Sequence, residues 1–284
     1  MAIGKFDVLG QIGRGAGSSV LKIKRHSDGK VYALKVVAVQ EADDRRYVEQ
    51  CQTEFDAASR FDHPNLCRAF ELEVSKSLFG KITGSRLLLE FIDGKPLSEF
   101  QKLPIGKLLA IFSKVAAGLA HMHAVGFLHA DVKPDNILVT TNGDVKLIDY
   151  GVAWRRGEKK ERVQGTLEFL APEQAKKRIV TVQTDIFNFG ATMYRVFSGA
   201  PIPEAFHERG SSRYADMDTL VRPLTEVDPS FPKEVDELVR QCLRYKPDAR
   251  PESVKAVGRA LVDQARKHLP APPRSNDGGE SAEA

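Results

Sequence analysis

From Phe6 to about Ile92 the chain alternates between apolar and polar positions as strands do. Residues 20–24 alternate strictly, and residues 31–37 are rich in β-branched side chains. A Ser-Asp-Gly-Lys turn separates these two runs, as expected for neighbouring strands. This first part of the chain is therefore predicted to consist mostly of strands.

After Gly94 the spacing of apolar residues becomes helical. Apolar side chains between Leu108 and Leu119 cover most of a helix surface, so we expect that helix to be buried nearly all round. Two more stripes with helical spacing follow Pro232 and Pro251. The second part of the chain is therefore predicted to be mainly helical.

The C-terminal segment 270–284 differs from both parts. It contains no Val, Ile, Leu or aromatic residue. Such a segment cannot bury enough apolar surface to offset the entropy of ordering the chain. We therefore predict that it is disordered.

The composition fits one large globular domain or two coupled ones: 284 residues, 42% of them hydrophobic and 28% charged. Lysine and arginine number 42, and aspartate and glutamate 38, so the formal net charge is +4. This balance argues against nucleic acid or an anionic membrane as the main partner. We also expect no membrane span, because no stretch approaches the roughly 20 apolar residues that a span needs. The composition fixes no oligomeric state.

Three cysteines, Cys51, Cys67 and Cys242, are widely spaced and form no CxxC motif. A disulfide framework or a zinc site is therefore not expected. The N-terminus also lacks the basic segment and apolar core of a secretory signal. We therefore expect reduced thiols and a cytoplasmic protein.

A glycine-rich segment, Ile-Gly-Arg-Gly-Ala-Gly-Ser-Ser-Val at residues 12–20, lies between two predicted strands. Glycines lack a Cβ, so their backbone N–H groups can approach and bind phosphate oxygens. A glycine-rich hairpin without a ligand would have the same sequence. A dinucleotide-binding fingerprint is disfavoured, because a strand and not a helix follows the glycines.

Lys35 lies inside an apolar strand, where a cation is costly unless an anion meets it. A predicted helix from about Asp43 to Phe61 carries an apolar stripe, and Glu54 lies on that stripe. These positions suggest a buried ion pair between Lys35 and Glu54. An edge lysine that reaches solvent and a solvated glutamate would fit the same residues.

The densest group of polar residues lies among short apolar runs between Leu128 and Gly151. Asp131, Lys133, Asn136 and Asp149 interrupt these runs. Each run would pack better without them, which is the pattern of a functional site. The side-chain oxygens of Asn136 and Asp149 are hard ligands of the kind that Mg²⁺ prefers alongside phosphate.

Together, these motifs resemble the eukaryotic-type (Hanks-type) serine/threonine protein kinase family, over about Phe6 to His268. The resemblance implies an α+β, bilobal protein-kinase fold. Its N-lobe, residues 1–92, would hold an antiparallel β-sheet with one helix, and its C-lobe, residues 93–269, would be mainly helical.

The resemblance also implies roles for individual residues. Asp131 would be the catalytic base, and Lys133 would stabilise the transferring phosphoryl group. Asn136 and Asp149 would bind Mg²⁺. The residues implied in ATP binding are the phosphate-loop residues Ile12, Gly13, Arg14, Gly15 and Ser18, the ion pair Lys35 and Glu54, the adenine-sandwiching Val20, Ala33 and Leu138, and the hinge residues Glu90 and Ile92.

Downstream motifs agree with the same family. Residues 165–173, Gly-Thr-Leu-Glu-Phe-Leu-Ala-Pro-Glu, resemble the end of an activation segment. The resemblance pairs Glu173 with Arg250, and it places Thr166 beside Asp131 and Lys133.

Two departures from the family pattern concern regulation. Position 130 is Ala, whereas most members have an Arg that receives the activation-loop phosphate. Between Val152 and Gly165 there is no Ser, Thr or Tyr. Both features predict a kinase that needs no phosphate in this segment. The segment is basic and could meet an acidic partner, or it could be a solvated loop; its basic residues are Arg155, Arg156, Lys159, Lys160 and Arg162.

Two other substitutions leave the catalytic groups intact. Tyr150 stands where Phe is usual, and its hydroxyl needs a hydrogen-bond partner if the ring is buried. Asn188 stands where a smaller residue is usual, and the sequence suggests no role for it.

Two other functions share part of this pattern. A pseudokinase would bind nucleotide or regulate a partner, but pseudokinases typically lack one of the catalytic groups that are all present here. A small-molecule kinase of the aminoglycoside phosphotransferase type shares the spacing from Asp131 to Asn136. Thr166 and the Ala-Pro-Glu motif instead favour a protein substrate, and Lys133 favours the serine/threonine branch. The implied partners are therefore ATP with Mg²⁺ and a protein with a Ser or Thr acceptor.

Overall fold

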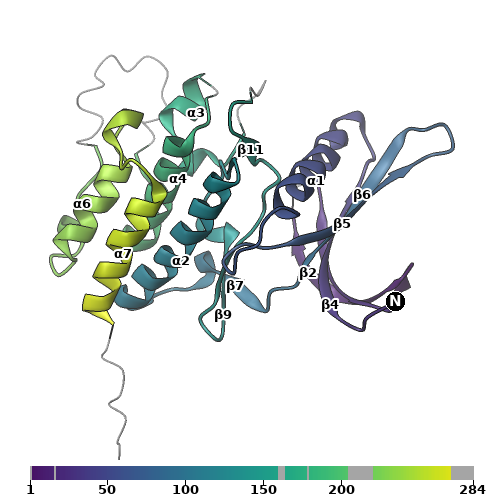
Figure 1. Cartoon of the computed structure of the whole chain (residues 1–284), viewed down its shortest axis with the longest axis horizontal. Helices are drawn as coiled ribbons and strands as arrows, with labels where there is room; N and C mark the ends of the chain where they lie inside the picture. Colours follow the sequence, from purple (N-terminus) through teal and green to yellow (C-terminus); the bar gives the residue numbers. More distant parts are fainter. Residues whose placement is uncertain (1, 16, 159–163, 178, 204–219, 270–284) are drawn as a thin grey trace, which may run out of the picture.

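A computed structural model of the chain describes residues 2–15, 17–158, 164–177, 179–203 and 220–269. The predicted disorder of segment 270–284 lies outside these residues. Figure 1 shows a strand-rich part that contains the N-terminus and, beside it, a group of helices.

The strand-rich part is one antiparallel sheet of six strands in the order β1-β2-β3-β4-β6-β5. Its core includes Ile23, Leu34 and Leu88. Ile23 on β3 lies between more exposed neighbours, as the sequence pattern predicts, whereas β4 and β6 are buried in continuous runs. The strands are β1 (Ala2–Ile3), β2 (Phe6–Arg14), β3 (Ser19–Arg25), β4 (Val31–Ala38), β5 (Ala69–Lys76) and β6 (Ile82–Glu90).

Helix α1 (Arg45–Ala58) follows a short 3₁₀ turn, η1 (Ala42–Asp44), and packs on β5 and β6 of the sheet. It buries Cys51 and Glu54, as the apolar stripe predicts. The helix ends earlier than the predicted residue 61, because the N–H of Phe61 reaches back only three residues, to the carbonyl of Ala58. Phe61 is nevertheless buried.

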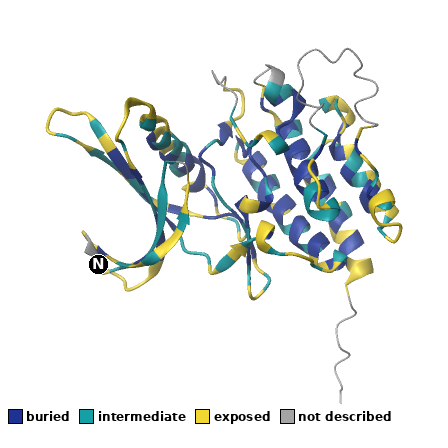
Figure 2. Ribbon diagram, turned by 180° about the vertical axis from the view of Figure 1, so that it is seen from behind, coloured by how far each residue is buried: buried dark blue, intermediate teal, exposed yellow. Residues whose placement is uncertain are grey.

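The second part is built on α2 (Ile105–Ala124), α4 (Val182–Ser198) and α7 (Val254–His268). Figure 2 shows buried residues along these helices, and the core that they form continues into α1 and the sheet at Val48 and Leu87. Shorter helical elements surround them: α3 (Pro172–Lys177), α5 (Leu224–Val227), α6 (Lys233–Cys242), η2 (Leu97–Glu99), η3 (Pro134–Asn136), η4 (Leu167–Phe169) and η7 (Pro247–Ala249).

Helix α2 is the one described helix that bears on the expectation of no membrane span. Its 20 residues and its hydropathy of 1.3 make it long and apolar enough to cross a membrane, by length and composition alone. Here α2 packs against α7, α4 and β8, and its Leu109, Phe112 and Val115 are fully buried. The helix is thus buried on several sides because it forms the centre of the core.

Two small antiparallel sheets lie where the two parts meet. One contains β7 (Gly94–Pro96), β9 (Ile137–Thr140) and β10 (Val145–Leu147). The other pairs β8 (Phe127–Leu128) with β11 (Trp154–Arg155). These strands hold the two ends of the polar segment 129–149, and they bring it next to the larger sheet.

Candidate active site

The glycine-rich segment connects β2 to β3, as predicted. The N–H of Gly15 donates to the carbonyl of Ser18 at 2.8 Å, which closes the turn. A Cβ on Gly17 would lie only 2.1 Å from the ring of Tyr47 on α1. Glycine is therefore required at position 17, because the loop packs directly on that aromatic ring.

Lys35 on β4 forms the ion pair with Glu54 that its position in an apolar strand suggests. Its Nζ atom lies 2.7 Å from Oε2 of Glu54 and 3.3 Å from Oδ1 of Asp149. Burial disfavours the charged form of Lys35 and so lowers its pKa. The negative charges of the two carboxylates have the larger effect, and the pKa of Lys35 is raised. Burial raises the pKa of Glu54, whereas Lys35 lowers that of Asp149. The site thus holds one cation between two carboxylates.

Asp149 and Tyr150 are held by the backbone around them. Asp149 has a left-handed φ of 64°, an unusual conformation for a residue with a side chain. The buried hydroxyl of Tyr150 donates to the carbonyl of Leu147 at 2.6 Å and accepts from the N–H of Cys67 at 2.9 Å. The hydrogen-bond partners that this buried hydroxyl needs are therefore both backbone groups.

Asp131, Lys133 and Thr166 form one hydrogen-bonded cluster. Oδ1 of Asp131 accepts from the backbone N–H of Thr166 at 2.7 Å. Nζ of Lys133 lies 3.2 Å from Oδ2 of Asp131 and donates to Oγ1 of Thr166 at 2.7 Å. The placement of Thr166 beside the other two residues is confirmed.

Helix α4 holds the segment that carries Asp131. Asp185 is fully buried and accepts from the N–H groups of His129 at 2.9 Å and Ala130 at 2.8 Å. Thr192, two turns further along α4, donates to the carbonyl of Val132 at 2.9 Å. Ala130 lies in the left-handed region with a φ of 62°, a conformation that these bonds stabilise.

Asn136 and Asp149 provide oxygens suited to Mg²⁺. The Nδ2 atom of Asn136 donates to the carbonyl of Asp131 at 2.9 Å, which fixes the amide and leaves its oxygen free to act as a ligand. Oδ1 of Asp149 accepts from Lys35 at 3.3 Å and from the N–H of Gly151 at 3.4 Å, whereas Oδ2 accepts no hydrogen bond from the described residues. Two protein oxygens fit a metal that completes its shell with phosphates and water.

One cleft of about 560 Å³ brings several predicted residues together. Gly15 and Ser18 of the phosphate loop line it, together with Lys35, Asp131, Lys133 and Asp149. Other predicted residues lie outside its lining. They are the phosphate-loop residues Ile12, Gly13 and Arg14 on β2, the adenine residues Val20 on β3, Ala33 on β4 and Leu138 on β9, the hinge residues Glu90 on β6 and Ile92 after β6, and also Glu54 and Asn136. The cleft therefore corresponds to the phosphate end of the predicted site.

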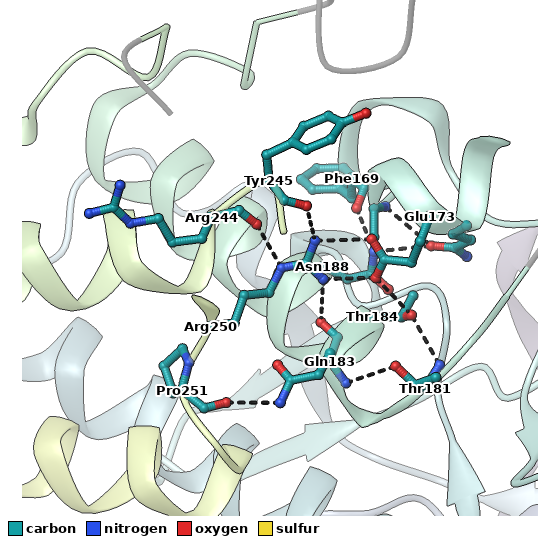
Figure 3. Close-up of polar contacts among 12 residues, drawn as sticks. Phe169, Glu173, Thr181, Gln183, Thr184, Asn188, Arg244, Tyr245, Arg250 and Pro251 are labelled. Atoms are coloured by element: carbon teal, nitrogen blue, oxygen red, sulfur yellow. Dashed lines mark hydrogen bonds and ion pairs between the residues drawn. The ribbon is translucent and has the colours of Figure 1, made fainter. Parts of the chain in front are cut away.

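Two ion pairs tie down the segment between Asp149 and Glu173. Arg155 on β11 contacts both carboxylate oxygens of Asp56 on α1, at 2.7 to 3.0 Å. Glu173 and the buried Arg250 pair at 2.7 and 3.0 Å, as predicted, and Figure 3 shows carbonyl groups around the same guanidinium. The basic residues Lys159, Lys160 and Arg162 lie outside the described residues.

Three residues that hold the site were not predicted from the residues themselves. Gln174, Asn188 and Thr192 are buried and bond to backbone groups of the catalytic and activation segments. One signal was available: Asp185, Asn188 and Thr192 follow each other at helical spacing through an otherwise apolar helix. Asn188, for which the sequence suggested no role, donates to the carbonyl of Phe169 at 2.6 Å (Figure 3).

Comparisons with known proteins agree with this geometry. A family model described as "Protein kinase domain" matches residues 6–262. The chain is 24% identical to serine/threonine-protein kinase PrkC of Bacillus subtilis, over 89% of this chain and 39% of PrkC. It is 26% identical to serine/threonine-protein kinase PknA of Mycobacterium tuberculosis, over 99% of this chain and 66% of PknA.

Among solved structures, the kinase domain of Mycobacterium tuberculosis PknI, a double mutant, has the same fold. Its TM-score is 0.71 at 23% identity, and the match covers 93% of this chain and 97% of that one. The chain spans only part of the length of its curated relatives, 39% in the case of PrkC.

Proposed function

The chain belongs to the protein kinase domain family, and from this premise we propose that it transfers the γ-phosphoryl group of ATP to serine or threonine hydroxyls of protein substrates. It has the bilobal α+β fold of that family. The observation that carries the proposal is the cluster of Asp131, Lys133 and Thr166, which shares one cleft with Lys35 and Asp149.

Each residue of the cluster has its own role in the transfer. Asp131 accepts the proton of the substrate hydroxyl as the oxygen of that hydroxyl forms a bond to the γ-phosphorus. The bond between that phosphorus and the β-γ bridging oxygen breaks, and ADP leaves. Lys133, bonded to Thr166, is placed to stabilise negative charge on the transferring group. Thr166 lies beside both residues, where it can orient the incoming hydroxyl.

Lys35 and the glycine-rich loop bind the rest of the nucleotide. The Lys35 ammonium is held by Glu54 and is available to the α- and β-phosphates. Asn136 and Asp149 would hold Mg²⁺, which supplies positive charge to the phosphates when bound. Gly15 and Ser18 line the same cleft, which places the glycine-rich loop beside those phosphates.

We further propose that this kinase works without a phosphate in its activation segment and that it acts in the cytoplasm. The absence of Ser, Thr and Tyr between Val152 and Gly165 and the Ala at position 130 support the first proposal. The ion pair between Arg155 and Asp56 supports it too, because it ties the segment to α1 without a phosphate. The three cysteines, all buried and unpaired, are consistent with a reducing compartment.

The activity is tested by incubating the purified chain with radiolabelled ATP, Mg²⁺ and a generic protein substrate such as casein, followed by phosphoamino acid analysis. We expect label on serine or threonine and none on tyrosine. Asp131→Asn should lower the rate by about 10²- to 10⁴-fold while nucleotide affinity stays nearly unchanged.

Two outcomes would contradict the proposed activity. Nucleotide binding without any transfer, unaffected by Asp131→Asn, would indicate a pseudokinase. Transfer only to small hydroxyl compounds would indicate a small-molecule kinase. For the regulatory proposal, the protein is stripped with a broad phosphatase, and mass spectrometry confirms that residues 149–173 carry no phosphate. A rate that then falls about tenfold or more, equal to about 1.4 kcal/mol of barrier, would overturn it.

A further inference from the structure

Gln174, at the start of α3, is the most completely bonded side chain next to the catalytic segment. It is 2% exposed. Its Nε2 atom donates to the carbonyls of Ala130 at 2.8 Å and Gln164 at 2.9 Å. Its Oε1 atom accepts from the N–H of Ala171 and from Nδ2 of Asn188, both at 3.3 Å. Both amide hydrogens and the amide oxygen are therefore in use.

The two carbonyls belong to segments that must stay in register for the reaction. Ala130 immediately precedes Asp131, and Gln164 lies two residues before Thr166. Gly165 lies between Gln164 and Thr166. A Cβ on Gly165 would come within 3.0 Å of the Ala130 carbonyl oxygen and 3.1 Å of Nε2 of Gln174. The end of the activation segment therefore presses directly on the catalytic segment, and Gln174 bridges the two.

Asn188 on α4 holds this bridge from behind. Its Nδ2 atom donates both to Oε1 of Gln174 and, at 2.6 Å, to the carbonyl of Phe169 in the activation segment (Figure 3). One helix turn earlier, Asp185 accepts from the N–H of Ala130. Helix α4 thus fixes both sides of the Ala130 backbone, the N–H directly and the carbonyl through Gln174.

We propose that Gln174, seated by Asn188, is a positioning residue that locks the end of the activation segment onto the catalytic segment, in place of a phosphate and its receiving arginine. This inference rests on the proposed kinase activity. It accounts for how a chain with Ala at position 130 keeps Thr166 against Asp131. A neutral amide forms this lock in the newly made chain, so no modification is needed to close it.

The chemistry of the lock predicts which substitution breaks it. Two carbonyl oxygens face Nε2 of Gln174, so the group at this position must donate two hydrogen bonds. A glutamate has nearly the same shape, but its carboxylate donates none and would face two oxygens. Gln174→Met removes the donors without adding a charge.

The experiment compares Gln174→Glu and Gln174→Met with the unphosphorylated wild-type chain. Gln241→Glu is the matched control, because it makes the same chemical change at an exposed position of α6. Three quantities are measured: turnover on casein, nucleotide affinity by titration calorimetry, and hydrogen exchange of the peptide that covers residues 164–171.

For both Gln174 variants we expect turnover to fall at least about tenfold, because small misplacements of reacting groups are costly. Nucleotide affinity should stay within about threefold of wild type, since the ion pair of Lys35 and Glu54 lies elsewhere in the cleft. Exchange in peptide 164–171 should become faster, while exchange in α2 stays slow. Gln241→Glu should change none of the three.

Three outcomes would overturn the proposal: unchanged exchange in peptide 164–171, unchanged turnover, or a loss of nucleotide affinity as large as the loss of turnover. The last would mean that Gln174 merely supports the fold. If Gln174→Glu does not fold, Gln174→Met decides. The exchange measurement needs no turnover, so it still tests the lock if the wild-type chain transfers no phosphate and the proposed function itself fails.

Discussion

Arg155 of the activation segment grips Asp56 of helix α1 with two guanidinium nitrogens, which lie 2.7 to 3.0 Å from the carboxylate oxygens. Asp56 also pairs with Arg60, just beyond the end of α1, at 3.0 Å. The contact links the helix that carries Glu54 to the strand that leads away from Asp149. The activation segment is therefore held in place partly by electrostatic attraction.

Reversing the charge at one end of this contact should weaken activity. Reversing both ends should restore it in part, because a lysine at position 56 would still face Arg60. The side chains of Arg155 and Asp56 are 45% and 39% exposed, so we expect either single variant, Arg155→Glu or Asp56→Lys, to cost less than about 1 kcal/mol of stability. Turnover should fall by about threefold at low salt and less at high salt. Equal turnover in the single and double variants would show that the contact does not position the segment.

Lys35→Met should destabilise the fold as well as stop turnover. Breaking one side of a buried ion pair costs about 3–5 kcal/mol, because Glu54 is left without a partner. Burial already raises the pKa of Glu54 from 4.5, and the loss of Lys35, which opposes that rise, should raise it further. A raised folded-state pKa gives stability at low pH that is lost as pH rises. The variant should therefore lose stability as pH rises above about 4.5, in urea unfolding at several pH values.

The control for this prediction is Lys24→Met, which removes an exposed lysine from β3. It should leave both the midpoint of unfolding and its pH dependence close to wild type. A Lys35→Met chain that unfolds at the wild-type midpoint would show that Glu54 becomes solvated at little cost.

Because of Asp185, the protein should become less stable as the pH falls into the acid range. Burial opposes its charge, but hydrogen bonds from His123 and from the N–H of Ala130 lower its pKa below the ordinary 3.8. A lowered folded-state pKa gives stability above the unfolded value that is lost as pH falls. Wild type should therefore weaken below about pH 4. Asp185→Asn should be less stable at neutral pH and should lose less on acidification, as measured by urea unfolding.

Asp248→Asn provides the comparison for Asp185, because Asp248 is exposed on η7. Its unfolding curve should follow wild type throughout the acid range. If Asp185→Asn declines with acid as steeply as wild type does, the lowered pKa of Asp185 contributes nothing measurable.

Tyr150→Phe should be mild, although the hydroxyl that it removes is buried. The N–H of Cys67 donates to the carbonyl of Leu147 at 3.0 Å as well as to the Tyr150 hydroxyl, so both backbone groups keep a partner. We expect a loss of about 1 kcal/mol or less in the free energy of unfolding. Turnover should stay within about twofold of wild type. A loss above about 3 kcal/mol would mean that the hydroxyl, and not the ring, holds this turn.

The family resemblance implied the bilobal fold, and the polar residues of the candidate site could be predicted from the sequence because each leaves a local mark. Lys35 stands out as a cation in an apolar strand, and Glu54 as a carboxylate on an apolar stripe. Asp131 and Asp149 interrupt short apolar runs in the same way. A charge at a position where burial is expected is costly, so it indicates a partner even before the partner is known.

Gln174, which supports the site, leaves no such mark. Gln174 bonds to backbone carbonyls of Ala130 and Gln164, which lie 44 and 10 residues away in the chain. Backbone carbonyls exist at every position, so no pairing of residue types shows which one Gln174 will meet. The predicted adenine residues do not line the cleft, because the cleft is the phosphate end of the site and lies between the glycine-rich loop and Thr166.

Trp154 is the one tryptophan of the chain, and it lies on β11, in the strand that Arg155 anchors. It is 4% exposed, its indole N–H donates to the carbonyl of Glu158 at 2.8 Å, and its backbone pairs with Leu128 on β8. When it is excited at wavelengths that the six tyrosines do not absorb, the protein therefore emits from a single indole, inside the segment whose order matters most. Release of β11 from β8 would expose the indole to water and shift its emission to longer wavelength. The protein thus carries its own optical reporter of that strand, and its docking can be followed in real time without a label.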